Sequence, residues 1–455
     1  MNAEIYIQQM IVRSRAAQSV FEGFTQQQVD QAVRAIGKAV YDHAEELSRL
    51  AVDETGMGIY EDKILKNKNK SKACWNKLKG QKSRGILRQI ESEGLVEVAK
   101  PMGVVGAICP STNPTMTPMQ NAMIALKGGN SIICSPHPRA KKSSMLTCRI
   151  MRKALADIGA PADLVQCVEE PNIEKSGFVM SLCDVCISTG GPGMVTAAYH
   201  SGKPAFGVGP GNVQALVDRE IDLPRAVAAI VQGRIYDAGI LCTCEQSIIY
   251  PAEQHDAVLA AMANEKVCYI DDDSQIQSLR STIFPDGKIN PEMVGKSAFY
   301  IASCAGIPIS EETRAILILA QGTGTDDILS GEKLCPVLSA YPYHSWEEAV
   351  AIAKTNILNM GIGHSVVIHS QHNSHIEYAA LQLPVSRFAV NQQGSSALGG
   401  AFTNGLNPTG TLGCGSWGNN SISENLWYHH LINVTRIAYT IADREIPTDD
   451  QIWNT

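Results

Sequence analysis

The stretch Val104-Val105-Gly106-Ala107-Ile108-Cys109 is apolar throughout, with no alternation between polar and apolar residues. Such a run is typical of a strand that is buried on both faces of a parallel sheet. Three further short apolar runs follow along the chain, at 131–134, 164–168 and 185–188. The intervening segments at 116–127, 140–158 and 175–182 are long enough for crossover helices. This βαβ series predicts an open α/β sheet.

The pattern extends on both sides of this region. Upstream, apolar residues recur at helical spacing from Val29 to Leu50, and Gly56 is a plausible stop, which predicts one helix over 26–56. Downstream of residue 211 we predict strands at 246–250, 334–340 and 365–369, and helices at 224–231, 254–263 and 346–354. These elements indicate a second α/β domain. The Gly-, Asn- and Ser-rich tail that starts at Asn404 is expected to pack on another subunit.

Length and composition exclude several classes of protein. The 455 residues favour two or three domains, and 44% hydrophobic against 18% charged residues is too apolar for a disordered chain. No run approaches the ~18 to 20 apolar residues of a membrane span, and residues 1–20 do not resemble a secretory signal. A net charge of −7 argues against nucleic acid or an acidic membrane as a partner. The 13 cysteines, most of them inside apolar runs, fit thiols in a reducing compartment, so we expect a cytoplasmic protein.

Two glycine-rich segments each have more than one interpretation. Gly207-Val-Gly-Pro-Gly-Asn212 differs in spacing from the dinucleotide-binding G-x-G-x-x-G turn, and a backbone crossing between domains is favoured. Ser188-Thr-Gly-Gly-Pro-Gly193 follows a predicted strand and precedes a segment that can be helical. It suits either the approach of a cofactor to a helix N-terminus or an ordinary tight turn.

The segment Cys242-Thr243-Cys244 lies in a predicted loop that precedes a strand. A zinc site would lack a second pair of ligands at the usual spacing, and a disulfide between residues i and i+2 would be strained. A nucleophilic thiolate, which requires partial exposure and polar neighbours, and a buried structural cysteine both remain as interpretations. Cys183-x-x-Cys186 has redox spacing but lies in an apolar strand, where burial is predicted.

Ten basic residues and no acid occur between Lys63 and Arg88. In a net-negative chain this local field attracts an anionic ligand, although a solvated helix face explains most of the lysines. Trp75 is the only aromatic residue there that could stack on a base, which argues against a nucleic-acid surface. We predict that His369, His372 and His375 form a polar surface turn, and that the protein has no metal site.

Taken together, seven segments resemble the CoA-acylating branch of the aldehyde dehydrogenase superfamily. They occur in the expected order over nearly the whole chain: Pro110–Pro114, Ser135–Lys142, Ser188–Gly191, Gly207–Asn212, Cys242–Ser247, Glu332–Val337 and Leu412–Trp417. Within that branch the sequence looks most similar to CoA-dependent succinate-semialdehyde dehydrogenases and acylating sulfoacetaldehyde dehydrogenases.

The resemblance implies an α/β fold with two Rossmann-like three-layer domains and a small oligomerisation element. It places a dinucleotide-binding domain at 1–212 and a catalytic domain at 213–404. Residues 405–455 would return to the first domain and form the interface of a homodimer or homotetramer.

The same resemblance implies roles for particular residues. Cys242 is the nucleophile, whereas Cys244 stands where relatives commonly have Ser. Asn113 matches the side-chain donor that stabilises the oxyanion together with the Cys242 N–H. The dinucleotide is expected to contact two turns and one acid, which comprise Ser135, His137, Arg139, Thr189, Gly190, Gly191 and Glu332. Residues 207–212 occupy the place of the general-base Glu of hydrolytic relatives but carry no carboxylate, so the thioester would survive until CoA accepts the acyl group.

The implied reaction is a reversible oxidation of a short anionic aldehyde, succinate semialdehyde or sulfoacetaldehyde, to its acyl-CoA with NADP or NAD. Lys70, Ser111, Thr243 and His364 are the expected substrate-binding residues. Alternatives are an acylating acetaldehyde or propionaldehyde dehydrogenase, a hydrolytic aldehyde dehydrogenase, and a non-catalytic relative that forms assemblies. Besides the cytoplasm, the resemblance allows association with a bacterial microcompartment.

Overall fold

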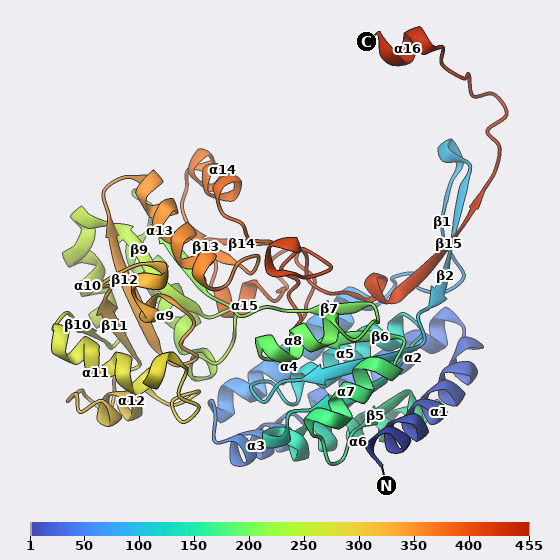
Figure 1. The fold of residues 1–455 in the computed structure, drawn as a ribbon, viewed down its shortest axis with the longest axis horizontal. Coiled ribbons are helices and arrows are strands. Elements are labelled where there is room, and N and C mark those ends of the chain that lie inside the picture. The colour runs from blue at the N-terminus through green and yellow to red at the C-terminus, as the bar shows by residue number, and fades with distance from the viewer. Residues whose placement is uncertain (1, 455) are drawn as a thin grey trace.

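The computed structural model describes residues 2–454, apart from the side chain of Pro192, and these residues form three β-sheets. Two of the sheets are parallel and lie in the two lobes of Figure 1. The third sheet is antiparallel and projects from one lobe together with the C-terminal end of the chain.

The first lobe contains a five-stranded sheet in the order β5-β4-β3-β6-β7. Its strands are β3 (Val104–Cys109), β4 (Ser131–Pro136), β5 (Val165–Cys167), β6 (Val185–Ser188) and β7 (Ala205–Gly207), and the intervening helices are α5 (Met116–Lys127), α6 (Lys141–Asp157), α7 (Ile173–Leu182) and α8 (Pro192–Tyr199). Val105 and Ala107 of β3 pack in the core on the α5 side, whereas Val104 and Ile108 pack on the α7 side. Helices therefore cover both faces, and the predicted α/β sheet is confirmed.

Four helices precede this sheet, namely α1 (Ala3–Glu22), α2 (Gln26–Asp42), α3 (Ala44–Thr55) and α4 (Tyr60–Leu78). The single helix predicted over 26–56 is wrong, because the chain breaks at His43 (φ −97°, ψ 16°) between α2 and α3. The apolar spacing does not reveal this break, since Ile36 of α2 and Leu47 of α3 are buried in the same core.

The second lobe contains a seven-stranded parallel sheet in the order β10-β11-β12-β9-β8-β13-β14. The strands are β8 (Val213–Val217), β9 (Glu245–Pro251), β10 (Val267–Ile270), β11 (Ala315–Leu319), β12 (Val337–Tyr343), β13 (Val366–His369) and β14 (Phe388–Val390). The helices are α9 (Leu223–Ile235), α10 (His255–Asn264), α11 (Asp273–Ile283), α12 (Ala298–Cys304), α13 (Trp346–Asn359), α14 (Asn373–Gln382) and α15 (Gly394–Ala397). The strand predicted at 334–340 begins only at Val337, because Leu334 has φ +49° and is not extended.

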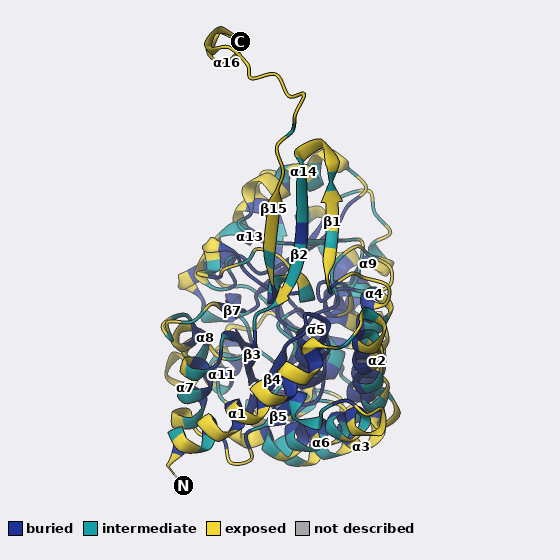
Figure 2. Cartoon of the chain, turned by 90° about the vertical axis from the view of Figure 1, so that its right-hand side faces the viewer, coloured by how far each residue is buried: buried dark blue, intermediate teal, exposed yellow. Residues whose placement is uncertain are grey.

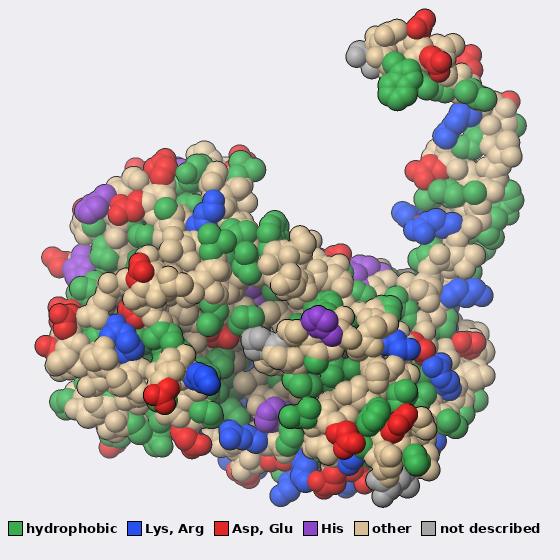
Figure 3. Space-filling view, viewed as in Figure 1, with side chains coloured by type: hydrophobic (Ala, Val, Ile, Leu, Met, Phe, Trp, Pro, Cys, Tyr) green, Lys and Arg blue, Asp and Glu red, His purple; other side chains and the backbone are tan. Residues whose placement is uncertain are grey.

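The third sheet is a narrow arm in the order β1-β2-β15, formed by β1 (Ile86–Ile90), β2 (Leu95–Pro101) and β15 (Ile432–Ala438). Beyond β15 the chain extends away from the lobes to α16 (Asp449–Trp453), as Figures 1 and 3 show. Much of this tail is exposed in Figure 2, including the apolar side chains of Tyr439, Ile446 and Trp453. Among the described helices, none combines the length and the apolar character that crossing a bilayer requires.

The histidines at 369, 372 and 375 do not form the predicted polar surface turn. His369 is buried in β13, and burial lowers its pKa to about 4. His375 lies on α14, where its Nδ1 is 2.7 Å from the buried carboxylate of Asp218 and its ring stacks on Trp346. The prediction was wrong because it was based on the polar Ser and Asn residues between the histidines in the sequence. In the structure, His369 and His375 lie on different elements, and each packs against its own neighbours.

Replacing Leu126 tests the core that positions the first sheet. Leu126 of α5 is fully buried, so Leu126→Ala should lower the free energy of unfolding by about 2–5 kcal/mol. Leu381→Ala is the matched control, because Leu381 also lies on a helix but is 83% exposed, and its loss should cost less than about 0.5 kcal/mol. Urea unfolding followed by circular dichroism measures both, and equal losses would contradict this packing.

Candidate active site

A cavity of about 550 Å³ is lined by residues of both lobes. Its wall is formed by α4, by the loop after β3, by the loop before β9 and by the segment from Gln393 to Leu412. Cys242 and Asn113 both line it, although they are 129 positions apart, and Asn113 follows β3 of the first sheet whereas Cys242 precedes β9 of the second. The structure therefore brings together the two residues that the sequence singled out as nucleophile and oxyanion donor.

Cys242 lies in the loop between the turn Tyr236–Gly239 and β9, and it is partly exposed. The interlobe crossing at 208–212 passes directly over it, because a Cβ on Gly211 would collide with the carbonyl oxygen of Cys242. Only glycine fits there. Cys244, two residues on, is fully buried, and its Sγ lies 3.8 Å from the Tyr236 carbonyl oxygen. Of the two sulfurs, the one at position 242 is therefore the one that faces the cavity.

The surroundings of Cys242 favour the neutral thiol in the ligand-free chain. Burial raises its pKa, and the nearby Glu332 carboxylate raises it further, whereas the Arg387 guanidinium opposes both effects. Arg387 is itself buried, and one of its nitrogens donates to the Gly413 carbonyl oxygen. A thiolate, the reactive form, therefore requires that ligand binding or deprotonation change this balance.

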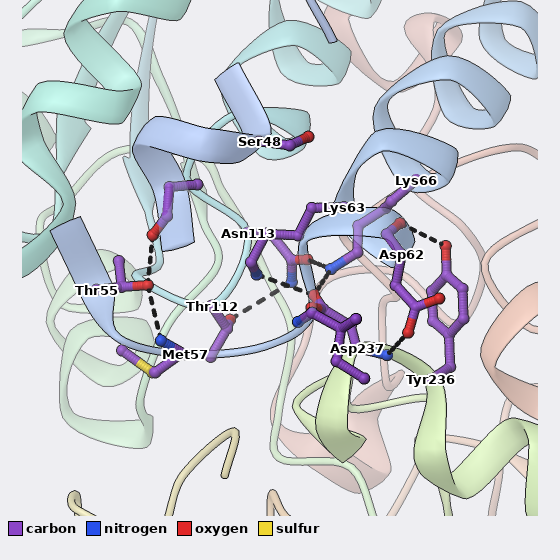
Figure 4. A network of polar contacts seen from close by, with 12 residues as sticks. Ser48, Thr55, Met57, Asp62, Lys63, Lys66, Thr112, Asn113, Tyr236 and Asp237 are labelled. Carbon is purple, nitrogen blue, oxygen red and sulfur yellow. Dashed lines mark hydrogen bonds and ion pairs between the residues drawn. The ribbon is translucent and has the colours of Figure 1, made fainter. Parts of the chain in front are cut away.

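Asn113 is held by a contact that the sequence did not suggest. Its Oδ1 accepts a 2.7 Å hydrogen bond from Lys66 Nζ, whereas among the described residues its Nδ2 has only a long 3.4 Å contact with Thr112 Oγ1 (Figure 4). Lys66 and Lys63 are both buried and form ion pairs with Asp237. Their i, i+3 spacing, continued by Lys70 at i+7, places them on one face of α4, and this spacing was the available signal.

Two of the four expected substrate-binding residues, Lys70 and Thr243, line the cavity. Lys70 Nζ donates to the Gly399 carbonyl oxygen at 2.8 Å, and burial lowers the pKa of this ammonium. Ser111 precedes Asn113 in the loop after β3 but is not among the described residues of the cavity wall. His364 is fully buried and is not among the described residues of the cavity wall, and burial together with Arg387 lowers its pKa to about 3, so its ring is neutral.

The residues expected to bind a dinucleotide include one acid. Burial raises the pKa of Glu332 to about 7, and its Oε1 is buried without a hydrogen-bond partner among the described residues. An unpartnered acceptor of this kind fits the donor hydroxyl of a ribose.

The other expected dinucleotide contacts lie at two turns of the first sheet. A Cβ on Gly191 would meet no described atom within 4 Å, and one on Gly190 only Met194, so a ligand can approach this backbone closely. The Thr189 hydroxyl is 2.8 Å from that of Thr411. In the turn after β4, the Ser135 hydroxyl is 2.9 Å from that of Ser176, and His137 Nδ1 accepts from the Arg139 amide at 3.1 Å. The residues present fit a dinucleotide.

The effect of Glu332 on the thiol predicts a pH-dependent difference in alkylation. Because the pKa of Cys242 is raised, its reaction with iodoacetamide should accelerate about tenfold between pH 8 and pH 9, where Glu332 is already mostly ionised. At pH 8 the Glu332 carboxyl group is mostly ionised, and Glu332→Gln removes its negative charge. The variant should therefore react about threefold to tenfold faster than the wild type at this pH. At pH 6, where Glu332 is mostly protonated, the two proteins should react at similar rates. Mass spectrometry of the Cys242 peptide gives the rates, and a slower Glu332→Gln variant at pH 8 would contradict this electrostatic arrangement.

Comparison with known proteins agrees with this geometry. Residues 2–271 match the model of the aldehyde dehydrogenase family. The chain is 49% identical to a succinate-semialdehyde dehydrogenase (acetylating) of Clostridium kluyveri, with all of both chains covered. It is 36% identical to a sulfoacetaldehyde dehydrogenase (acylating) of Bilophila wadsworthia, over 97% of this chain and 96% of the relative.

Solved structures show the same fold. A propionaldehyde dehydrogenase from Rhodopseudomonas palustris, crystallised with bound CoA and an acylated cysteine, superimposes with a TM-score of 0.86. The two sequences are 26% identical, and the match covers 95% of this chain and 96% of that one. The motifs, the two parallel sheets and these matches together show that the chain belongs to the aldehyde dehydrogenase family.

Proposed function

We propose that the protein oxidises a short anionic aldehyde to its acyl-CoA, reversibly and with NADP or NAD as hydride acceptor, through a thioester on Cys242. The observation that carries this proposal is the cavity itself. It unites a partly exposed cysteine, an amide donor and three lysines in one wall.

The first step is addition of the Cys242 thiolate to the aldehyde carbon. The carbonyl π electrons move to oxygen, and the oxyanion is stabilised by the Asn113 Nδ2 and the Cys242 N–H. When bound, the nicotinamide supplies an acceptor for the hydride that leaves this carbon, and a thioester then remains on Cys242. The thiolate of CoA attacks the thioester carbonyl, the bond to Cys242 breaks with its electron pair, and Cys242 is released as a thiolate.

The choice of CoA over water rests on the segment that passes over Cys242. The crossing 207–212 passes over Cys242 but carries no carboxylate that could activate a water molecule. The CoA and acylated cysteine in the Rhodopseudomonas palustris enzyme support the same choice. Hydrolysis to a free acid is the competing outcome of the experiment below.

The charge of the cavity supports an anionic substrate. Lys66, Lys70 and Lys72 contribute to the wall, and Asp62 is the one acid among its described residues. A net positive wall attracts a carboxylate or a sulfonate at the far end of a short aldehyde. The succinate-semialdehyde and sulfoacetaldehyde dehydrogenases among the relatives act on such molecules by name.

A direct assay tests the reaction. The protein, mixed with succinate semialdehyde, NAD or NADP, and CoA, should produce reduced nicotinamide at 340 nm and succinyl-CoA by mass spectrometry. Cys242→Ala should abolish turnover, because no other sulfur replaces the nucleophile, whereas removal of the exposed and distant thiol in Cys304→Ala should not. Formation of free succinate at an undiminished rate without CoA would show the hydrolytic alternative.

Lys70 should select for charge. Loss of a charge-assisted contact is worth about 1.5–3 kcal/mol, so Lys70→Met should lower kcat/KM for succinate semialdehyde about tenfold to a hundredfold. For butanal, which has the same carbon chain but no carboxylate, the change should be less than about threefold. Lys68→Met is the matched control, because Lys68 is on the same helix but is not among the described wall residues. An equal loss with both aldehydes would contradict charge recognition.

A further inference from the structure

Asp237 occupies the centre of a buried network between the two lobes (Figure 4). Its side chain is fully buried, and its Oδ2 pairs with Lys63 Nζ at 3.0 Å and with Lys66 Nζ. Its Oδ1 accepts a 2.8 Å hydrogen bond from the Ile59 amide. Burial alone would raise the pKa of Asp237, but Lys66 and Lys63 hold it below its usual value. The carboxylate is therefore ionised and serves both ammonium groups.

The backbone around Asp237 is held in an unfavourable conformation. Asp237 and Ala238 have φ of +50° and +54°, a region that costs a residue with a Cβ roughly 1–2 kcal/mol. Asp62 compensates for this, because its Oδ2 accepts a 2.8 Å hydrogen bond from the Asp237 amide. The Tyr236 hydroxyl donates to the Asp62 carbonyl oxygen at 3.2 Å. The turn that leads to Cys242 is thus attached to α4 both through the Asp237 side chain and through its backbone amide.

Lys66 is the member of this network that joins Asp237 to Asn113, and it lines the cavity together with Asp62 and Tyr236. One of its three N–H bonds is directed at Asp237, and another donates to Asn113 Oδ1 at 2.7 Å. Because the oxygen and nitrogen of an amide belong to one planar group, fixing Oδ1 also fixes the direction of Nδ2. A cation on the oxygen also polarises the amide and makes its N–H groups stronger donors. Lys63 contacts the same carboxylate, but the structure shows no bond from Lys63 to Asn113.

We propose that Lys66, held by Asp237, is the positioning residue of the oxyanion site, and that it orients and polarises Asn113 so that Nδ2 faces the oxygen of a tetrahedral adduct on Cys242. This role rests on the proposed functions of Cys242 and Asn113. It differs from a purely structural role, in which Lys66 would only join α4 to the second lobe.

Two reactions of the same sulfur separate these roles. Acylation by p-nitrophenyl acetate passes through a tetrahedral oxyanion and needs neither nucleotide nor CoA, whereas alkylation by iodoacetamide displaces iodide at a saturated carbon and forms no oxyanion. Lys66→Met should slow the acylation of Cys242 about tenfold or more and leave its alkylation within about twofold. Lys63→Met is the matched control: it removes an equally buried ammonium from the same carboxylate, and its ratio of acylation to alkylation should equal that of the wild type. Equal slowing of both reactions in Lys66→Met would overturn the proposal.

A double-mutant cycle provides the second measurement. If Lys66 acts through Asn113, Lys66→Met should slow acylation less than about twofold in an Asn113→Ala background, whereas additive losses would overturn the proposal. If Lys66→Met does not fold, Lys66→Gln replaces it in the same double-mutant cycle. Because Gln keeps a neutral hydrogen-bond donor, its acylation rate should lie between those of the wild type and Asn113→Ala. If the cycle shows the expected coupling between Lys66 and Asn113 but the protein has no CoA-dependent turnover, the proposed function is refuted and this inference is supported. If the ratio of acylation to alkylation at wild-type Cys242 is no higher than that of free cysteine, this inference is refuted.

Discussion

The buried carboxylate of Asp237 is the interaction on which the arrangement of the site depends. It belongs to the second lobe, yet its partners Lys63 and Lys66 lie on α4 of the first, so one charged group bridges the two lobes beside the cavity. Removing one member of a buried ion pair typically costs about 3–5 kcal/mol, because the other charge is left without compensation. Asp62 is half-buried and supports the carboxylate from the backbone side, because its Oδ2 accepts a hydrogen bond from the Asp237 amide.

A second set of charges surrounds the sulfur. Burial and Glu332 keep the thiol of Cys242 protonated in the ligand-free chain, while Arg387 favours the thiolate. Since Glu332 has a pKa of about 7, its own charge changes near neutral pH, and the reactivity of the thiol follows it. A ligand that donates a hydrogen bond to Glu332 would neutralise part of this charge. Under the proposed role of Glu332 in nucleotide binding, occupation of that site would therefore favour the Cys242 thiolate.

The sequence predicted the helices and strands better than it predicted contacts between side chains that are distant in the chain. The strands at 104–109 and 185–188 and the helix at 116–127 agree with the structure to the residue, because each is a continuous apolar or helical segment with clear ends. The break at His43 was missed because both helices bury the same kind of face.

The candidate site was predicted in part. Cys242 and Asn113 were identified through the family motifs, and the structure places both in one cavity. Lys66 was taken for part of a solvated run, since its partner Asp237 is 171 positions away and nothing in a local window indicates that pairing. Contacts between side chains so distant in the chain arise from the packing of two lobes, which periodicity and motif spacing do not encode.

The strand-to-strand crossing at 208–212 has a mechanical consequence. It connects β7 of the first sheet to β8 of the second. Its backbone at Gly211 lies against the carbonyl oxygen of Cys242. The chain returns to the first lobe between α15 and β15, so this crossing is one of two covalent connections between the lobes. A rotation of one lobe against the other would displace the crossing, and the Cys242 peptide would have to move with it or lose this contact.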